Sequence, residues 1–481
     1  MRTFTGLAAV VTLVFAAGCG GGSSASGPTA KDPSGKAVTD SKGNAVSVEA
    51  ANKFKAGLQA MVQHDKANDW NDATCQSTAE LFSEAAKEQG NKTFAEALYN
   101  AGLAYQRCKK DAEAKKTFEQ VLQSNPKFHP ARVQVALYNF AGSGEKDIDR
   151  AIAEMRQAAV VDAQYKNVEA LVQLALLYMK RGNNVADGDG PNDFQRAKRY
   201  IQSALAVDDG FMPAFNQLAI YYLETAKQKA GRATGKRVAA ASSKEKKVDT
   251  QAMELAALVC EQAVRKNPNY APVYNTLGMI YVELGNLNTA VQSFNNARRI
   301  DPSFYEAQMN YAAVNLGFRG FKQAEEAYRA ALKMRPNDYD ARLGLALALR
   351  GQIDDTNFDK MVAAASAELE AAKKIAPDRA ETYYNEAILT QEYKAKSGGK
   401  GAEPFLQQAK TLFGQFIQKA GSQAEFADAA KRAKERMEEI DQIIAFNRQT
   451  ADEQKKAEAE AKQKAAEQEA GAGAPGEQEQ Q

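Results

Sequence analysis

The chain has 481 residues, of which 44% are hydrophobic, so it is long enough to bury one elongated core or several separate ones. Lys and Arg number 62 against 60 Asp and Glu, which leaves a formal charge of +2 at pH 7. This balance gives no general reason to expect nucleic-acid binding, and any basic chemistry has to be local.

Residues 1–18 have the features of an export signal. Arg2 supplies a positive charge, an apolar stretch too short for a stable spanning helix follows, and small residues precede Cys19. With the Gly- and Ser-rich segment after it, this arrangement resembles the lipobox of bacterial lipoproteins, in which the cysteine is acylated and becomes the mature N-terminus. Ala16 stands where that pattern usually has Leu. The alternative is an ordinary signal peptide with an incidental Cys19.

The lipobox resemblance implies attachment to a membrane through Cys19. Gly20 replaces the Asp that tends to hold lipoproteins in the inner membrane, so we expect the periplasmic face of the outer membrane. Several acyl chains anchor a protein stably, whereas a single chain is marginal at roughly 0.8 kcal/mol per buried methylene. No later apolar run approaches the ~20 residues of a spanning helix. Residues 19–47 are predicted to be an unstructured, flexible tether.

Residues 48–94 are predicted to form a pair of helices that caps the fold at its N-terminal end. This segment contains Trp70 and Cys75. An exported compartment permits a disulfide between Cys75 and Cys108, but two separate buried thiols explain the same residues. Cys260 is expected to be an odd buried thiol.

A period of 34 residues governs the segment 95–419. Prolines and alanines recur at this spacing: Pro268, Pro302 and Pro336, and Ala263, Ala297 and Ala331. Within one period, aromatic and small residues take helical offsets on two successive helices: Tyr274, Leu277, Gly278 and Tyr281, then Ala290, Phe294 and Ala297. Small residues let the helix backbones approach, and aromatic residues fill the layers between them. The pattern resembles the tetratricopeptide repeat (TPR), with suitable residues at all eight signature positions.

The TPR resemblance implies an all-α, right-handed superhelical solenoid of about eight repeats. Three repeats are clear, at 95–128, 271–304 and 305–338, and degenerate copies occupy 129–165, 168–210, 212–269, 339–378 and 380–419. An amphipathic helix at 420–449 is predicted to cap the last repeat. Residues 450–481 are predicted to be a charged low-complexity tail, a marginal helix that frays into a disordered end.

The largest insertion into the repeat pattern is the basic segment 225–249. Its basic residues include Lys236, Arg237, Lys246 and Lys247. One interpretation is electrostatic docking to an acidic protein, an anionic lipid or peptidoglycan, and the other is a solvated loop. Its GRATGKR stretch is not a phosphate-binding loop, because the glycines are too close together and Arg237 replaces the Ser or Thr that holds magnesium. We do not expect nucleic acid as a partner of an exported lipoprotein.

A second loop, at 183–193, holds Asp187, Asp189 and Asp193, whose oxygens would suit Ca²⁺. The spacing does not fit an EF-hand, because Val185 and Arg196 would occupy ligand positions, so the prediction is a plain loop. No motif pairs a nucleophile with a base and the chain has two His, so we expect no catalytic residue, metal site or cofactor.

First-helix positions that stacking does not need remain for a protein partner: Asn275, Met279, Asn310 and Asn315. Asparagines at such positions could hold the backbone of an extended peptide, as in TPR proteins with peptide ligands. The alternative is that they are ordinary exposed polar residues of helices.

The whole layout resembles the repeat-containing lipoproteins of bacterial envelope machines, in particular that of the gliding-motility complex. This resemblance implies a non-enzymatic scaffold whose partners are other envelope proteins. Two alternatives remain: a pilotin or assembly factor for a secretin or outer-membrane protein, and an activator of cell-wall synthesis or hydrolysis.

Overall fold

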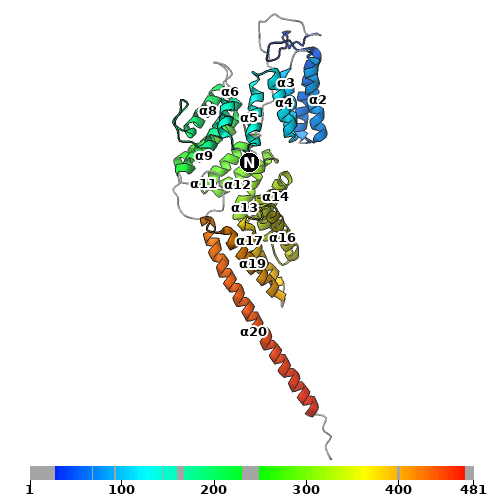
Figure 1. The fold of residues 1–481 in the computed structure, drawn as a ribbon, viewed down its shortest axis with the longest axis vertical. Coiled ribbons are helices and arrows are strands. Elements are labelled where there is room, and N and C mark those ends of the chain that lie inside the picture. Colours follow the sequence, from blue (N-terminus) through cyan, green and yellow to red (C-terminus); the bar gives the residue numbers. More distant parts are fainter. Residues whose placement is uncertain are drawn as a thin grey trace, which may run out of the picture. The chain divides into compact units, whose positions relative to one another are not determined.

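The computed structural model describes residues 28–67, 69–90, 94–144, 146–159, 167–229, 249–397 and 401–471. The described residues up to Thr276 belong to a first compact unit, and those from Leu277 onward belong to a second. Helices form almost all of both units, apart from isolated β-bridges in the described loops (Figure 1). The all-α prediction is therefore confirmed.

The first unit is a series of helices, and as far as the tenth each packs against the next along the chain. The helices are α1 (Val48–Ala67), α2 (Asp72–Glu88), α3 (Ala95–Arg107), α4 (Asp111–Ser124), α5 (His129–Gly142), α6 (Ile148–Ala159), α7 (Val168–Arg181), α8 (Asp193–Val207), α9 (Met212–Lys229), α10 (Thr250–Lys266) and the start of α11 (Ala271–Glu283). Helices two apart also touch, α5 with α7 and α7 with α9. Such contacts place the first helices of successive hairpins side by side, as a helical-repeat solenoid requires.

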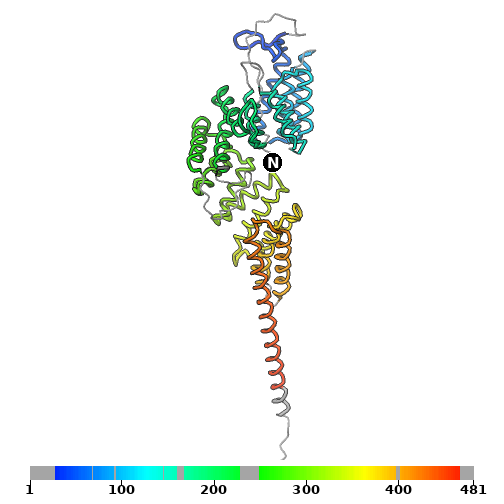
Figure 2. Tube along the Cα trace, turned by 60° about the vertical axis from the view of Figure 1, so that its left-hand side comes forward, coloured from blue at the N-terminus to red at the C-terminus, as the bar shows by residue number. Residues whose placement is uncertain are grey.

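The second unit repeats this arrangement, as the tube in Figure 2 shows. It contains the end of α11 and then α12 (Leu287–Ile300), α13 (Tyr305–Gly317), α14 (Phe321–Met334), α15 (Tyr339–Arg350), α16 (Phe358–Ile375), α17 (Ala380–Leu389), the π-helix η1 (Thr390–Lys394), α18 (Ala395–Ser397), α19 (Ala402–Ala420), the 3-10 turn η3 (Ala424–Phe426) and α20 (Ala427–Gly471). Here α13 contacts α15, and α15 contacts α17.

Close contact between a glycine and an aromatic ring fixes the spacing of the helices within a hairpin. A Cβ atom on Gly102 of α3 would lie 2.5 Å from Cε1 of Phe118 on α4. In the second unit, a Cβ atom on Gly278 would lie 2.6 Å from the ring of Phe294. Distances this short leave no room for any side chain, so the aromatic ring lies directly on the backbone of the facing helix. This is the physical reason for the small and aromatic residues at fixed offsets.

A disulfide ties the N-terminal pair of helices to the first repeat. Cys75 of α2 and Cys108, which caps the end of α3, form the bridge with their Cα atoms 6.1 Å apart. Of the two alternatives that the sequence left open, the structure has the disulfide. Cys260 is a buried free thiol as expected, and burial raises its pKa to about 12.

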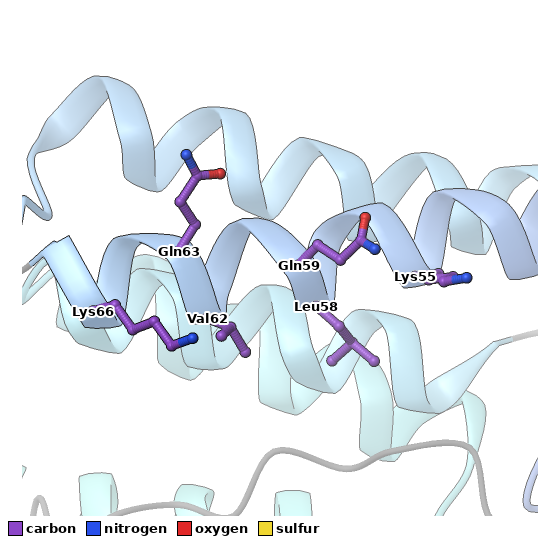
Figure 3. Close-up of a pocket in the computed structure, with 6 residues that line it drawn as sticks. All are labelled: Lys55, Leu58, Gln59, Val62, Gln63 and Lys66. Atoms are coloured by element: carbon purple, nitrogen blue, oxygen red, sulfur yellow. The ribbon is translucent and has the colours of Figure 1, made fainter.

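Helix α1 also has an exposed side. Lys55, Leu58, Val62 and Lys66, with two glutamines between them, line a shallow hollow on that side (Figure 3). Val62 is 53% exposed, which is high for a large apolar side chain.

Residues 28–47 are not the unstructured segment that the sequence predicted. The backbones of Ala30, Val38 and Val46 form a ring of hydrogen bonds, from the amide of Ala30 to the carbonyl of Val46, from Val38 to Ala30 and from Val46 to Val38. Two tight turns, closed by the side chains of Asp32 and Asp40, connect these three buried residues.

These turn residues pack onto the hairpins of the first unit. The amide of Ser41 donates to Oε1 of Glu96 on α3 at 2.6 Å, and the amide of Ser47 donates to Oε1 of Gln89 at 3.0 Å. Burial raises the pKa of Glu96, and the hydrogen bonds of Ser41 oppose that shift. The predicted tether 19–47 is therefore wrong for residues 28–47, and its remainder lies outside the described residues.

The C-terminal end forms one long helix. α20 continues without a break through the predicted boundary between the capping helix 420–449 and the tail 450–481. Its first part packs on α19 through Ile440 and Ile444, whereas every residue from 451 to 465 is exposed. Among the described residues, no helix has the length and apolar character needed to cross a membrane.

Candidate protein-interaction surface

A row of polar side chains runs across the first helices of the first unit. Each member lies two positions before a small, buried residue of its own helix, namely Gly102, Ala136, Ala175, Ala219 and Gly278. We call Asn100, Gln134, Gln173, Gln217 and Thr276 the polar row. All five side chains are buried, with at most 6% of their surface exposed.

Hydrogen bonds connect the polar row from one helix to the next. Gln106 of α3 donates from Nε2 to Oε1 of Gln134 on α5 at 2.9 Å, and Gln134 donates in turn to Oε1 of Glu169 on α7 at 3.1 Å. Farther along, Oγ1 of Thr276 donates to Oδ1 of Asn216 on α9 at 2.7 Å. The row therefore extends over five successive first helices from α3 to α11.

The surroundings of the row disfavour charge. Burial raises the pKa of Glu169 to about 8, although the hydrogen bond from Gln134 acts in the opposite direction. Burial also raises the pKa of Tyr99, which lies beside Gln134. Oε1 of Gln173 is buried and has no hydrogen-bond partner among the described residues. The neutral amide of Gln173, with an acceptor to spare, matches the peptide group, which has one donor and one acceptor.

The structure places the four predicted partner-binding residues on helices, in differing surroundings. Asn275 is 7% exposed, and Met279 packs beside the buried Phe294. Asn310 is half-buried, while Asn315 is 9% exposed and donates its amide to the carbonyl oxygen of Tyr311 at 2.8 Å. Their role in binding stays a prediction.

The other predicted site residues are Cys19, Lys236, Arg237, Lys246 and Lys247, and all five lie outside the described residues. The polar row itself was missed in the sequence. The sequence contains a pattern that identifies the polar row, because each member stands two positions before a small residue that recurs with the repeat.

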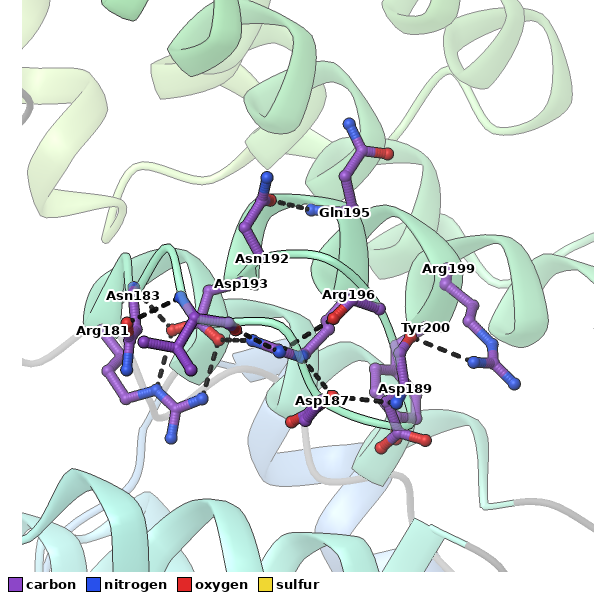
Figure 4. A network of polar contacts seen from close by, with 12 residues as sticks. Arg181, Asn183, Asp187, Asp189, Asn192, Asp193, Gln195, Arg196, Arg199 and Tyr200 are labelled. Carbon is purple, nitrogen blue, oxygen red and sulfur yellow. Dashed lines mark hydrogen bonds and ion pairs between the residues drawn. The ribbon is translucent and has the colours of Figure 1, made fainter.

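The aspartates of the 183–193 loop are held by arginines (Figure 4). Oδ1 of Asp193 accepts from Arg181 at 2.7 Å and from Arg196 at 2.5 Å, and Arg196 also donates to Asp187 at 2.7 Å. Burial alone would raise the pKa of Asp193, but hydrogen bonds from Arg181, Asn183 and Arg196 lower it overall. Guanidinium groups therefore already occupy these carboxylates, in an ion-pair network that is buried at Asp193 and Arg196. In the part of the chain that is described, no three His, Cys, Asp or Glu residues gather as metal ligands.

Comparison with known proteins identifies the repeats. Two models of the family described as tetratricopeptide repeat match the chain, one at residues 95–128 and the other at residues 259–292. The chain therefore contains tetratricopeptide repeats at these positions. The first match has the bounds of a repeat found in the sequence, and the second runs from the end of α10 through α11 into α12.

Curated relatives match this chain over short segments. The Hsp70-Hsp90 organizing protein of wheat (Triticum aestivum) is 28% identical over 96 residues, which is 20% of this chain and 16% of the wheat protein. Hsp70-Hsp90 organizing protein 1 of soybean (Glycine max) is 26% identical over 84 residues, covering 18% of this chain and 15% of that protein.

Solved structures of TPR proteins also align. A thermophilic TPR protein of Thermus thermophilus has 22% identity and a TM-score of 0.36, over 46% of this chain and 99% of that one. A tetratricopeptide repeat protein from Parabacteroides merdae has 15% identity and a TM-score of 0.35, over 65% of this chain and 98% of that one.

Proposed function

We propose that this TPR protein is a non-enzymatic scaffold that binds an extended segment of another protein along the polar row. The observation that carries the proposal is the continuity of the row over five first helices, with neutral hydrogen-bonding groups on each. The TPR matches and the two organizing-protein relatives agree with a protein as the partner.

The dimensions of the row set the length of the bound segment. Neighbouring packed helices lie about 9 Å apart, so five helices cover about 36 Å. An extended chain rises about 3.3 Å per residue, so a segment of about eleven residues would cover the row. The burial that raises the pKa of Glu169 disfavours carboxylates and ammonium groups at this place. The preferred segment is therefore short of charged residues.

A carboxyl group introduced into the row tests this function, and binding is measured above pH 8 because burial keeps the nearby carboxyl of Glu169 protonated up to about that pH. Gln173→Glu keeps the size of the side chain and replaces the amide, whose Oε1 is the spare acceptor, by a carboxyl group. Gln195→Glu, on the exposed surface of α8, is the matched control with the same change. Partner peptides of about eleven residues, identified by crosslinking in intact cells, would be titrated by fluorescence anisotropy. We expect Gln173→Glu to weaken binding by about tenfold or more while the control binds as the parent does. Equal binding by all three proteins would refute the proposal.

We further propose that acylated Cys19 holds the scaffold at the periplasmic face of the outer membrane. The lipobox resemblance supports this, and its test is a Cys19→Ser variant. We expect that variant to move from the membrane fraction to the soluble periplasmic fraction or to remain unprocessed, and an unchanged fractionation would contradict the proposal.

The proposed partners are subunits of an envelope-spanning machine of the gliding-motility type. Only the layout of signal, anchor, repeats and charged tail supports this step. Crosslinking of the tagged chain in intact cells, followed by mass spectrometry, would recover motility subunits of both membranes. Recovery of a secretin, a barrel-assembly factor or a cell-wall enzyme would replace the motility role with one of the two alternatives.

A further inference from the structure

Helix α1 carries an apolar pair between two cations. Lys55, Leu58, Val62 and Lys66 follow one another at intervals of three or four residues, which places them on one side of the helix (Figure 3). Lys55 and Lys66 are exposed, and no described carboxylate pairs with either of them. We call these four residues the α1 patch.

Helix α20 carries an apolar pair between two carboxylates. Glu439, Ile443, Phe446 and Glu453 lie on one side of that helix, and we call them the α20 patch. Phe446 is 68% exposed and Ile443 is 42% exposed, although the neighbouring Ile440 is fully buried against the rest of the unit. Large apolar side chains left open in this way mark interaction surfaces.

The two patches are complementary in order, charge and length. Each has a charged residue, two apolar residues and a second charged residue of the same sign, and the signs are opposite in the two patches. At 1.5 Å per helical residue, the lysines are about 17 Å apart and the glutamates about 21 Å apart. The flexible stems of lysine side chains cover the difference, so both ion pairs can form while the apolar residues meet.

We propose that the α20 patch of one copy of this chain packs against the α1 patch of a second copy. The surfaces are different on the two copies, so each copy keeps one patch open, and repeated contacts give head-to-tail assemblies, either closed rings or open chains. Neither patch includes a residue of the polar row. A chain of copies would therefore present many polar rows in sequence, which goes beyond the scaffold role of a single copy.

The contact is expected to be weak in solution. Two single helices meeting over about eleven residues bury less than the ~800 Å² per partner of a standard stable interface. Association should therefore depend on protein concentration. It should also weaken as salt screens the ion pairs, because the Debye length falls from about 10 Å at 0.1 M to about 3 Å at 1 M ionic strength.

Sedimentation velocity of the chain from Gly20 onward tests the proposal. We expect species larger than the monomer to grow with concentration at low salt and to shrink at high salt. A monomer at every concentration and salt would overturn the proposal.

Charge reversal identifies the surfaces. Variant A carries Lys55→Glu and Lys66→Glu, and variant B carries Glu439→Lys and Glu453→Lys. Each alone places like charges across the contact and should weaken association by about tenfold or more. A mixture of A and B restores opposite charges at both contacts, so we expect it to associate again. A matched control, Lys127→Glu with Lys322→Glu, changes the net charge as variant A does at exposed positions outside both patches.

The other possible results of the charge-reversal experiment also test the proposed contact. Association that persists in both A and B, or that the control abolishes equally, would overturn the proposal. The same holds if A and B lose association but their mixture does not regain it. All substituted side chains are exposed, and circular dichroism of each variant checks that its helices remain.

Discussion

Reduction of the Cys75–Cys108 disulfide is expected to loosen the N-terminal helices and leave the later repeats folded. The bridge joins α2 to the end of α3, and the two cysteines are 33 residues apart in the chain. The entropy lost by the unfolded chain on closing a loop of this length corresponds to about 3.7 kcal/mol at 25 °C. Because each helical repeat contacts only its neighbours, this loss should act locally.

The single tryptophan makes the effect measurable. Nε1 of Trp70 donates to Oδ1 of Asp65 at 2.8 Å, and the guanidinium carbon of Arg107 lies 5.9 Å from the centre of the ring. Trp70 therefore reports on the packing of α1, α2 and α3. Urea titration followed by its fluorescence should give a free energy of unfolding about 3 to 4 kcal/mol lower for the reduced protein. Circular dichroism should show that most helices outlast this transition.

Two results would refute this reasoning. One is a difference between oxidised and reduced protein below about 1 kcal/mol, which ordinary surface changes produce. The other is a count of more than one reactive thiol per chain. A chain that begins at Gly20 contains Cys75, Cys108 and Cys260, and under denaturing, non-reducing conditions we expect Cys260 alone to react. Replacing Cys260 by Ala is the control, and it should leave the difference between the two redox states unchanged.

Three further predictions concern the first unit. Gly102→Val should lower its stability by about 1 to 3 kcal/mol through overpacking, whereas Gly414→Val, at a glycine with open space around it, should cost less in thermal denaturation. Burial raises the pKa of Glu169 to about 8, so this carboxyl lowers the free energy of unfolding as the pH rises from about 5 to 8. Glu169→Gln should remove this loss of stability, and urea titrations across that pH range would measure the change. Asp193→Asn should cost about 1.5 to 3 kcal/mol because it removes the buried carboxylate that Arg181 and Arg196 share, although Asp149 and Asp187 still pair with them. The exposed Asp209→Asn should cost under about 1 kcal/mol, and equal losses would contradict a role of the shared carboxylate in stability.

The helical hairpins could be predicted from the sequence because their stacking requires particular residue sizes. Gly102 and Phe118, or Gly278 and Phe294, touch so closely that few other residues fit, and small residues recur at the same place in other repeats. The polar row repeats in the same way, although the prediction from the sequence selected other first-helix positions, such as Asn275 and Asn310. Because these features recur along the chain, they can be recognised in the sequence without the structure.

Features that depend on distant partners could not be predicted in this way. The turns closed by Asp32 and Asp40 look like a flexible tether by composition, and only their packing against residues such as Glu96 shows that they are ordered. The pairing of Asp193 with Arg181 likewise depends on how α7 and α8 meet. The choice between a disulfide and two thiols rests on the same kind of tertiary contact.

Site-specific photo-crosslinking in intact cells tests most directly whether the polar row binds an extended segment of another protein. A photoreactive residue would replace Leu176, which is half-buried on α7 and lies three residues after Gln173 on the same side of the helix. A probe at the exposed Gln195 of α8 is the control. We expect adducts with another protein from position 176, through one extended segment that is short of charged residues, and few or none from position 195. No protein adduct from position 176, or the same adducts from both positions, would contradict binding along the polar row.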